Sequence, residues 1–220
     1  MDQDGDMANP AACLFDLDGL LLDTEPLHGQ AWQAAARHFG GELSAEQLLG
    51  LRGQRRLDNA ARVCALLLEQ VSIEELLAIR QPIAEQLLAT AQPMPGAREL
   101  VERCHQDGIP MALATSSGSD SVAIKTAPHP WLELIGVRVT GDDPALKAGK
   151  PAPDVFLLAA SRLGVAAEEC WAFEDSVAGA QAAVAAGCRV YVLPPEEMDS
   201  NQYPSSSIQL GSLLDVLRCC

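Results

Sequence analysis

Five short apolar runs, each followed by polar residues, Gly or Pro, predict the buried strands of a sheet. They lie at residues 11–15, 110–114, 137–140, 170–173 and 189–193. Helical patterns separate the later runs, at residues 119–126, 154–163 and 178–186, with Gly164 and Gly187 placed to end the second and third helices. Strands that alternate with helices in this way are typical of a parallel, doubly wound α/β sheet.

One long stretch interrupts this alternation between the first and the second strand. Residues 26–91 are rich in Ala, Leu, Gln and Glu with helical spacing, and they contain no convincing strand. Prolines at 93–96 stop the helical pattern. The sequence therefore predicts a Rossmann-like α/β core, residues 8–22 plus 95–220, that carries an inserted α-helical cap domain of residues 23–94.

Composition and charge narrow the class of protein. The chain of 220 residues is 48% hydrophobic and 20% charged, which suits a compact domain and not a disordered one. Thirty Asp and Glu against fifteen Lys and Arg give a net charge of −15, which opposes nucleic-acid binding. Residues 1–7, an expected tail, carry three acids and no base, and no stretch is long enough to span a membrane. We expect a cytoplasmic monomer that binds neither nucleic acid nor membranes.

Polar side chains follow four of the predicted strands. In an open parallel sheet the carboxyl ends of the strands meet at one edge, where ligands bind. The residues that the sequence brings to this edge are Asp16, Asp18, Thr115, Ser116, Ser117, Asp142, Asp143, Lys150, Glu174 and Asp175. Several acids around one lysine are costly to hold together without a cation, and oxygen ligands of this kind suit Mg²⁺.

Asp16 and Asp18 can divide a reaction between them. Residues i and i+2 at the end of a strand project to the same side, so both carboxylates can face one ligand. One aspartate can attack phosphorus and carry the phosphoryl group, while the other moves protons to the leaving group and from water. Taken alone, the Asp-x-Asp-Gly pattern is more typical of an ordinary turn.

Each of the other polar groups likewise has a functional and a structural interpretation. Residues 115–118 offer hydroxyls and backbone N–H groups to an anion, or they simply cap the next helix. Lys150, on a proline-rich loop, can neutralise a phosphoryl oxygen, or it is a surface charge. Glu174 and Asp175 can complete a Mg²⁺ site with Asp16, or they belong to a turn.

Together, in this order, these motifs resemble the haloacid dehalogenase superfamily, in the subgroup of β-phosphoglucomutase, sugar-phosphate phosphatases and CbbY-type enzymes. The resemblance covers nearly the whole chain. It rests on Phe15-Asp16-Leu17-Asp18-Gly19, Asp23-Thr24-Glu25-Pro26-Leu27-His28, Pro95-Gly96-Ala97, Ala114-Thr115-Ser116-Ser117, Gly149-Lys150-Pro151-Ala152-Pro153-Asp154 and Phe173-Glu174-Asp175-Ser176 with Ala178-Gly179.

The resemblance implies a role for each matching residue. Asp16 is the nucleophile and a Mg²⁺ ligand, and Asp18 is the general acid and base, with its carbonyl also on the metal. Glu174 and Asp175 complete the metal site. Thr115 binds the phosphate, with Ser116 and Ser117 beside it, and Lys150 neutralises the charge of the phosphate.

Specificity is expected to come from the cap. Residues 50–56 hold the one dense basic cluster of the chain, and one of Arg52 and Arg55 is predicted to reach the distal part of the substrate. The alternative is a solvated helix start whose arginines pair with nearby acids. His28 resembles a residue near the hinge that contacts the active site in this subgroup, although a lone histidine can equally cap a helix.

We therefore expect a Mg²⁺-dependent phosphatase that hydrolyses a small phosphorylated metabolite, such as a sugar phosphate, through a phosphoaspartyl intermediate. A sugar phosphomutase of the β-phosphoglucomutase kind would use the same core residues. The absence of any lysine before Lys125, and so of a Lys-Asn substrate pair in the cap, favours hydrolysis. A binding protein without catalysis on the same fold is the third alternative.

Overall fold

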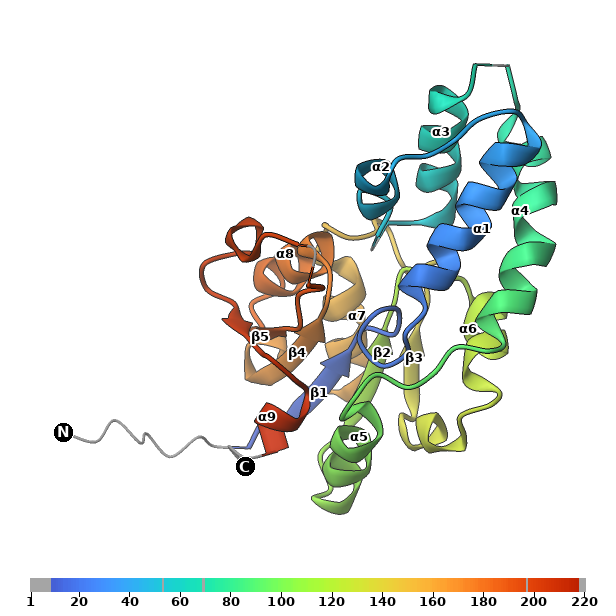
Figure 1. Ribbon diagram of the computed structural model, residues 1–220. Coiled ribbons are helices and arrows are strands. Elements are labelled where there is room, and N and C mark those ends of the chain that lie inside the picture. Colours follow the sequence, from blue (N-terminus) through green and yellow to red (C-terminus); the bar gives the residue numbers. More distant parts are fainter. Residues whose placement is uncertain (1–8, 53, 69, 197, 218–220) are drawn as a thin grey trace.

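The computed structural model describes residues 9–52, 54–68, 70–196 and 198–217, so the predicted tail at residues 1–7 lies outside the described residues. Two layers of structure are visible: a sheet flanked by helices, and a group of helices that stands over one end of the sheet (Figure 1). Among the described residues, no helix combines the length and the apolar character needed to cross a membrane.

The sheet has six strands in the order β3-β2-β1-β4-β5-β6, and every neighbouring pair is parallel. The strands are β1 (Ala12–Phe15), β2 (Met111–Ala114), β3 (Val137–Val139), β4 (Cys170–Glu174), β5 (Arg189–Val192) and β6 (Ile208–Gln209). The five predicted strands and the doubly wound α/β fold are thus confirmed, with strand ends that differ by one residue or less. The sequence did not predict β6, because this strand has only two residues and both are exposed.

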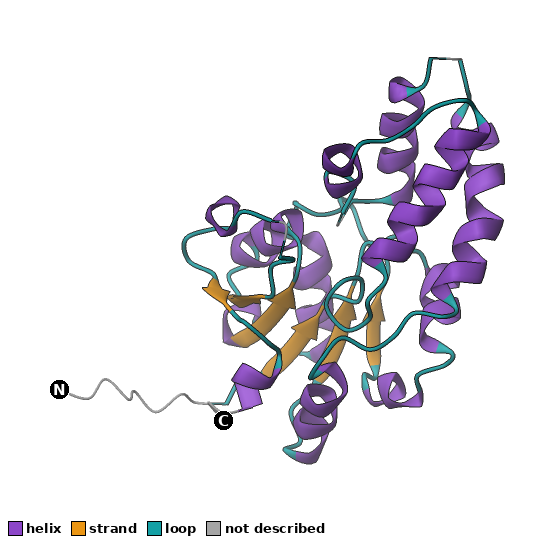
Figure 2. Ribbon diagram, in the orientation of Figure 1, coloured by secondary structure: helices purple, strands orange, loops and turns teal. Residues whose placement is uncertain are grey.

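Helices lie on both faces of the sheet (Figure 2), and alternate residues of β1, β2, β4 and β5 belong to different apolar clusters. Cys13 and Phe15 of β1 belong to the hydrophobic cluster that α5 (Ala97–Gln106) and α9 (Leu214–Leu217) cover. Ala12 and Leu14 belong to the cluster on the other face, under α7 (Asp154–Leu163) and α8 (Val177–Ala185). Helix α6 (Ser119–Thr126) follows β2. Because both faces are covered, the strands read as continuous apolar runs in the sequence.

The segment from residue 25 to residue 88, between β1 and α5, is helical, as predicted. Its helices are α1 (Glu25–His38), α2 (Ala45–Leu49), α3 (Arg56–Leu66) and α4 (Ile73–Leu88). Ser44 and Ser72 begin α2 and α4 with capping boxes, in which the serine hydroxyl and a side chain three residues later satisfy free backbone N–H groups. We refer to residues 25–88 as the helical insert. It has an apolar cluster of its own, built around Trp32, Val63 and Leu76.

Candidate active site

A cavity of about 360 Å³ lies between the helical insert and the carboxyl ends of the strands. Its volume is within the range of small-molecule sites, about 300–1,000 Å³. Of the residues predicted from the sequence, those that line it are Asp16, Asp18, His28, Arg55, Thr115, Ser116, Ser117 and Asp142. Strand ends and insert residues that lie far apart in the sequence thus meet at one cavity.

The end of β1 places its two aspartates by close packing around the turn. The Phe15 ring stacks on Phe173 of the neighbouring strand, with ring centroids 5.0 Å apart, and Leu17 is fully buried. Gly19 has a φ of +81°, and a Cβ on it would lie 2.1 Å from Asp175 Oδ2. Glycine is therefore required here, both by the backbone conformation and by the close approach of Asp175.

Asp16 is one of three buried carboxylates that lie close together. One oxygen from each of Asp16, Glu174 and Asp175 lies within 4.8 Å of the others, and we refer to these three residues as the acid cluster. Lys150, itself buried, donates a hydrogen bond of 2.5 Å to Asp16 Oδ1 and a second one to Glu174 Oε1. One ammonium group thus faces three carboxylates.

The pKa shifts in the acid cluster indicate that Lys150 alone does not neutralise its carboxylates. Burial raises the pKa of Asp16 to about 7, against the lowering effect of Lys150. Burial and the neighbouring acids Glu25 and Asp16 raise the pKa of Asp175 well above its ordinary value. Buried oxygen donors that repel one another suit a hard divalent cation, which would neutralise them. The acid cluster therefore fits the predicted Mg²⁺ site.

The carboxylate of Asp18 lies outside this cluster, in surroundings of hydrogen-bond donors. Thr24 Oγ1 donates to its Oδ1 (2.6 Å) and Ser117 Oγ to its Oδ2 (2.8 Å). Lys125 Nζ lies 2.6 and 2.7 Å from the two oxygens. Burial raises the pKa of Asp18, but Lys125 and His28 lower it more, so that it falls well below its ordinary value. A contribution of Asp18 to the metal through its carbonyl stays a prediction.

His28 reaches Asp18 in a defined protonation state. Its Nε2 lies 3.2 Å from Asp18 Oδ1, and its Nδ1 lies 2.7 Å from Nη2 of Arg80, a buried residue of α4. A guanidinium has no acceptor, so Nδ1 accepts and Nε2 carries the proton that is donated to Asp18. Burial lowers the pKa of His28, which favours this neutral form. The His28 side chain therefore contacts Asp18 and Arg80, and its role in a reaction stays a prediction.

The segment after β2, residues 115–118, does not cap α6 with its side chains. The N-cap of α6 is Gly118, which has no side chain, and Asp142 accepts the hydrogen bond of Ser119 N (2.9 Å) in its place. Thr115 is buried, and its Oγ1 accepts from Ser117 N (3.1 Å). This segment is therefore not an ordinary N-cap, although its phosphate-binding role stays a prediction.

The structure separates the two arginines of the basic cluster. Arg55 lines the cavity and packs on Gly149, where an added Cβ would lie 2.0 Å from Arg55 Nε. Arg52 lines a neighbouring cavity of about 380 Å³, and its Nε lies 3.7 Å from Glu25 Oε2. Arg55 thus lines the cavity that Asp16 and Asp18 line, and Arg52 lines the one that Asp175 lines.

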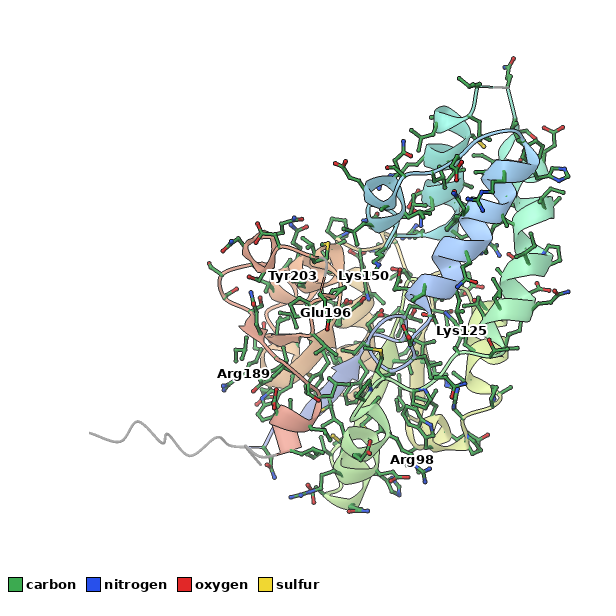
Figure 3. All side chains as sticks on the ribbon, viewed as in Figure 1. Arg98, Lys125, Lys150, Arg189, Glu196 and Tyr203 are labelled. Carbon is green, nitrogen blue, oxygen red and sulfur yellow. The ribbon has the colours of Figure 1, made fainter. Side chains whose placement is uncertain are left out.

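Sequence reasoning missed Lys125, Arg80 and Tyr203. Lys125 and Arg80 lie on helices, where a single charged residue ordinarily indicates the solvated face. Tyr203 lies between β5 and β6; it is buried and its hydroxyl donates to the Asp175 carbonyl. Figure 3 labels Tyr203 together with Lys125 and Lys150. No local pattern in the sequence indicates these contacts.

Three features together indicate one class of hydrolase. They are the doubly wound sheet, the paired aspartates after β1, and the lysine between two acids. Residues 10–187 match the haloacid dehalogenase-like hydrolase family, and the chain belongs to it. The predicted resemblance is thereby confirmed, and the chain is an enzyme.

Individual relatives cover nearly all of the chain. It is 38% identical to the probable pseudouridine-5'-phosphatase of Drosophila melanogaster, over 92% of this chain and 90% of that protein. It is 32% identical to (DL)-glycerol-3-phosphatase 2 of Arabidopsis thaliana, over 95% and 94%. The crystal structure of CbbY from Rhodobacter sphaeroides in complex with phosphate superposes with a TM-score of 0.81 and 26% identity, covering 94% of this chain and 96% of that one. The predicted enzyme class, a phosphoric monoester hydrolase, agrees with the family and with these names.

Gly179→Ala tests how tightly α8 holds the acid cluster. A Cβ at Gly179 would lie 1.9 Å from Glu174 Oε1 and 2.2 Å from Oε2, and Glu174 has no room to move because it is fully buried. We expect the substitution to lower the free energy of unfolding by about 1–3 kcal/mol, as overpacking does, and to weaken Mg²⁺ binding. Denaturant unfolding and metal titration measure both.

Gly136→Ala is the matched control, because nothing lies within 4 Å of a Cβ at that position. It is expected to leave both quantities unchanged. Equal effects of the two substitutions would show that the contact with Glu174 is not the cause.

Proposed function

We propose that the protein is a Mg²⁺-dependent phosphatase of small phosphorylated metabolites that works through a phosphoaspartyl intermediate. The observation that carries the proposal is the contrast between two carboxylates only two residues apart. Asp16 lies in the acid cluster beside Lys150, whereas Asp18 is surrounded by donors. Carboxylates in such different surroundings suit different roles, one as nucleophile and the other in proton transfer.

The first step transfers the phosphoryl group to Asp16. A carboxylate oxygen of Asp16 forms a bond to phosphorus, the ester P–O bond breaks, and the leaving oxygen takes a proton from Asp18. A bound phosphate dianion beside Asp18 opposes ionisation of that carboxylate, and so favours the protonated form that this step needs. Lys150, hydrogen-bonded to Asp16 Oδ1, orients the nucleophile.

The second step returns Asp16 to its starting state. Water attacks the phosphorus of the aspartyl phosphate, the bond between phosphorus and the Asp16 oxygen breaks, a proton of the water passes to Asp18, and inorganic phosphate leaves. The donors around Asp18 favour the ionised form that accepts this proton. Asp16, Glu174 and Asp175 would hold the Mg²⁺, which when bound neutralises charge on the phosphoryl oxygens.

We also propose that residues 8–22 with 95–220 form the core domain and that residues 23–94 form a cap domain that closes over the substrate. Ser116 and Ser117 would bind the phosphate, and Arg55, from the cap, would reach the distal part of the substrate. The relatives are named for phosphates of a nucleoside and of a polyol. Both compounds are small esters with hydroxyl groups, and a sugar phosphate belongs to the same class.

A phosphate-release assay tests this function. The panel contains pseudouridine 5'-phosphate, glycerol 3-phosphate, fructose 1-phosphate and p-nitrophenyl phosphate, each with Mg²⁺ and with EDTA. We expect release from at least one metabolite with Mg²⁺, loss of release with EDTA, and recovery when Mg²⁺ is added back, because three buried carboxylates need a cation to bind a phosphate. Isomer formation without release would instead indicate a phosphomutase. Release at the same rate in EDTA would contradict the metal site.

A further inference from the structure

Lys125 is a fully buried lysine with a complete set of hydrogen bonds. It lies on α6, and its ammonium group contacts Asp18 Oδ1 (2.6 Å), Asp18 Oδ2 (2.7 Å) and Ser117 Oγ (2.7 Å). An ammonium has three N–H donors, so these three acceptors use its whole donor capacity. Lys125 therefore has one rigid placement, directly against the carboxylate of Asp18.

Stability alone is a weak explanation for this pair. Removing two charges from water costs free energy that the attraction inside the protein often only offsets, and apolar residues of the same volume are commonly as stable. The pair does have a clear geometric effect. Both oxygens of Asp18 are held by Lys125, and Ser117 links the two residues by donating to Asp18 Oδ2 (2.8 Å).

The remaining donors to Asp18 come from a different part of the chain. Thr24 and His28, at the start of the helical insert, both reach Oδ1. Lys125 and Ser117 both donate to Oδ2. Lys125 is the residue that bonds both oxygens, and it thereby fixes the plane of the carboxylate. Loss of Lys125 would leave Asp18 free to rotate about its side-chain bonds.

We propose that Lys125 is a positioning residue that orients Asp18 for proton transfer to the leaving group. This inference rests on the proposed phosphatase function and adds a second lysine to it. Lys150 acts on the nucleophile and Lys125 acts on the proton-transferring carboxylate, and both are labelled in Figure 3 where the helical insert meets the strand ends. The two lysines therefore have different effects on substrates that differ in their leaving group.

The test is Lys125→Met, which nearly keeps the length of the side chain and removes its charge and donors. It is measured with glycerol 3-phosphate, whose alkoxide needs a proton to leave, and with p-nitrophenyl phosphate, whose phenolate leaves without one. The parameter compared is kcat/KM, because it covers only the steps up to phosphoryl transfer to Asp16. We expect a fall of roughly 10- to 100-fold with glycerol 3-phosphate, a part of the 10²–10⁴-fold that acid–base catalysis supplies, and about threefold or less with p-nitrophenyl phosphate.

A double-mutant cycle with Asp18→Asn separates this role from a structural one. If Lys125 acts through Asp18, Lys125→Met in the Asp18→Asn background changes kcat/KM for glycerol 3-phosphate by no more than about threefold, because the two losses are coupled. Equal losses with the two substrates, or additive losses in the cycle, would overturn the inference. The wild-type enzyme and Asp16→Asn, measured beside them, test the proposed function separately.

Lys125→Gln and Ser117→Ala keep the inference testable if Lys125→Met fails to fold. Lys125→Gln keeps an amide donor at the end of the side chain, and it should recover part of the activity with glycerol 3-phosphate. Ser117→Ala removes the link between Lys125 and Asp18 Oδ2. Like Lys125→Met, it should lower the ratio of kcat/KM for glycerol 3-phosphate to kcat/KM for p-nitrophenyl phosphate. A ratio that is unchanged in all three variants would contradict the proposal.

Discussion

Asp16→Asn is expected to reduce phosphate release by at least about 10³-fold, as the loss of a covalent nucleophile does in other enzymes. The amide nitrogen cannot attack phosphorus, and the amide oxygen is a far weaker nucleophile than a carboxylate. The change is nearly isosteric, so the packing of Phe15 and Leu17 around it is preserved. The measurement is phosphate release from the best substrate of the panel, with Mg²⁺ present.

Trapping of the intermediate gives this prediction a second readout. Wild-type enzyme quenched in acid during turnover of a radiolabelled phosphate ester should retain label on the protein, and Asp16→Asn should retain none. Asp120→Asn is the matched control, because Asp120 is exposed on α6 and is expected to leave turnover unchanged. Turnover of Asp16→Asn above about a tenth of the wild-type rate would exclude Asp16 as the nucleophile.

Local sequence patterns were sufficient to predict most of the fold. Strands covered on both faces must be apolar throughout, and this makes them visible as short continuous runs. Gly164 and Gly187 adopt φ values of +73° and +89° and end their helical segments as predicted, because a residue without Cβ enters this conformation at little cost. Helix α8 begins one residue earlier than expected, where Ser176 Oγ accepts from Gly179 N.

The contacts that complete the site could not be predicted in this way. Lys125 lies 107 residues from Asp18 in the sequence, and Arg80 lies 52 residues from His28. Helical periodicity assigns a residue to a face of its own helix, but it does not reveal which distant element that face meets. The same limit explains why the sequence could not choose between Arg52 and Arg55, which are three residues apart and line different cavities.

Lys150→Met is expected to have the second large effect, on stability as well as on activity. It leaves the carboxylates of Asp16 and Glu174 buried without their shared cation. Removal of one partner from a buried ion pair costs about 3–5 kcal/mol of unfolding free energy. Turnover is expected to fall by about 10²–10³-fold, the range for the loss of one electrostatic contact to a reacting group. Denaturant unfolding and phosphate release measure the two effects.

Mg²⁺ should distinguish a charge effect from a packing effect in this variant. A cation bound to the folded protein stabilises it by an amount that increases with the affinity and concentration of the ion. Without Lys150 the ion becomes the main counter-charge of the acid cluster, so added Mg²⁺ should raise the unfolding midpoint of Lys150→Met more than that of the wild type. Lys147→Met, the same substitution at an exposed residue three positions away, should show neither effect. If Lys150→Met unfolds like the wild type and gains nothing extra from Mg²⁺, then Lys150 does not neutralise the acid cluster, and the arrangement proposed for phosphoryl transfer is wrong.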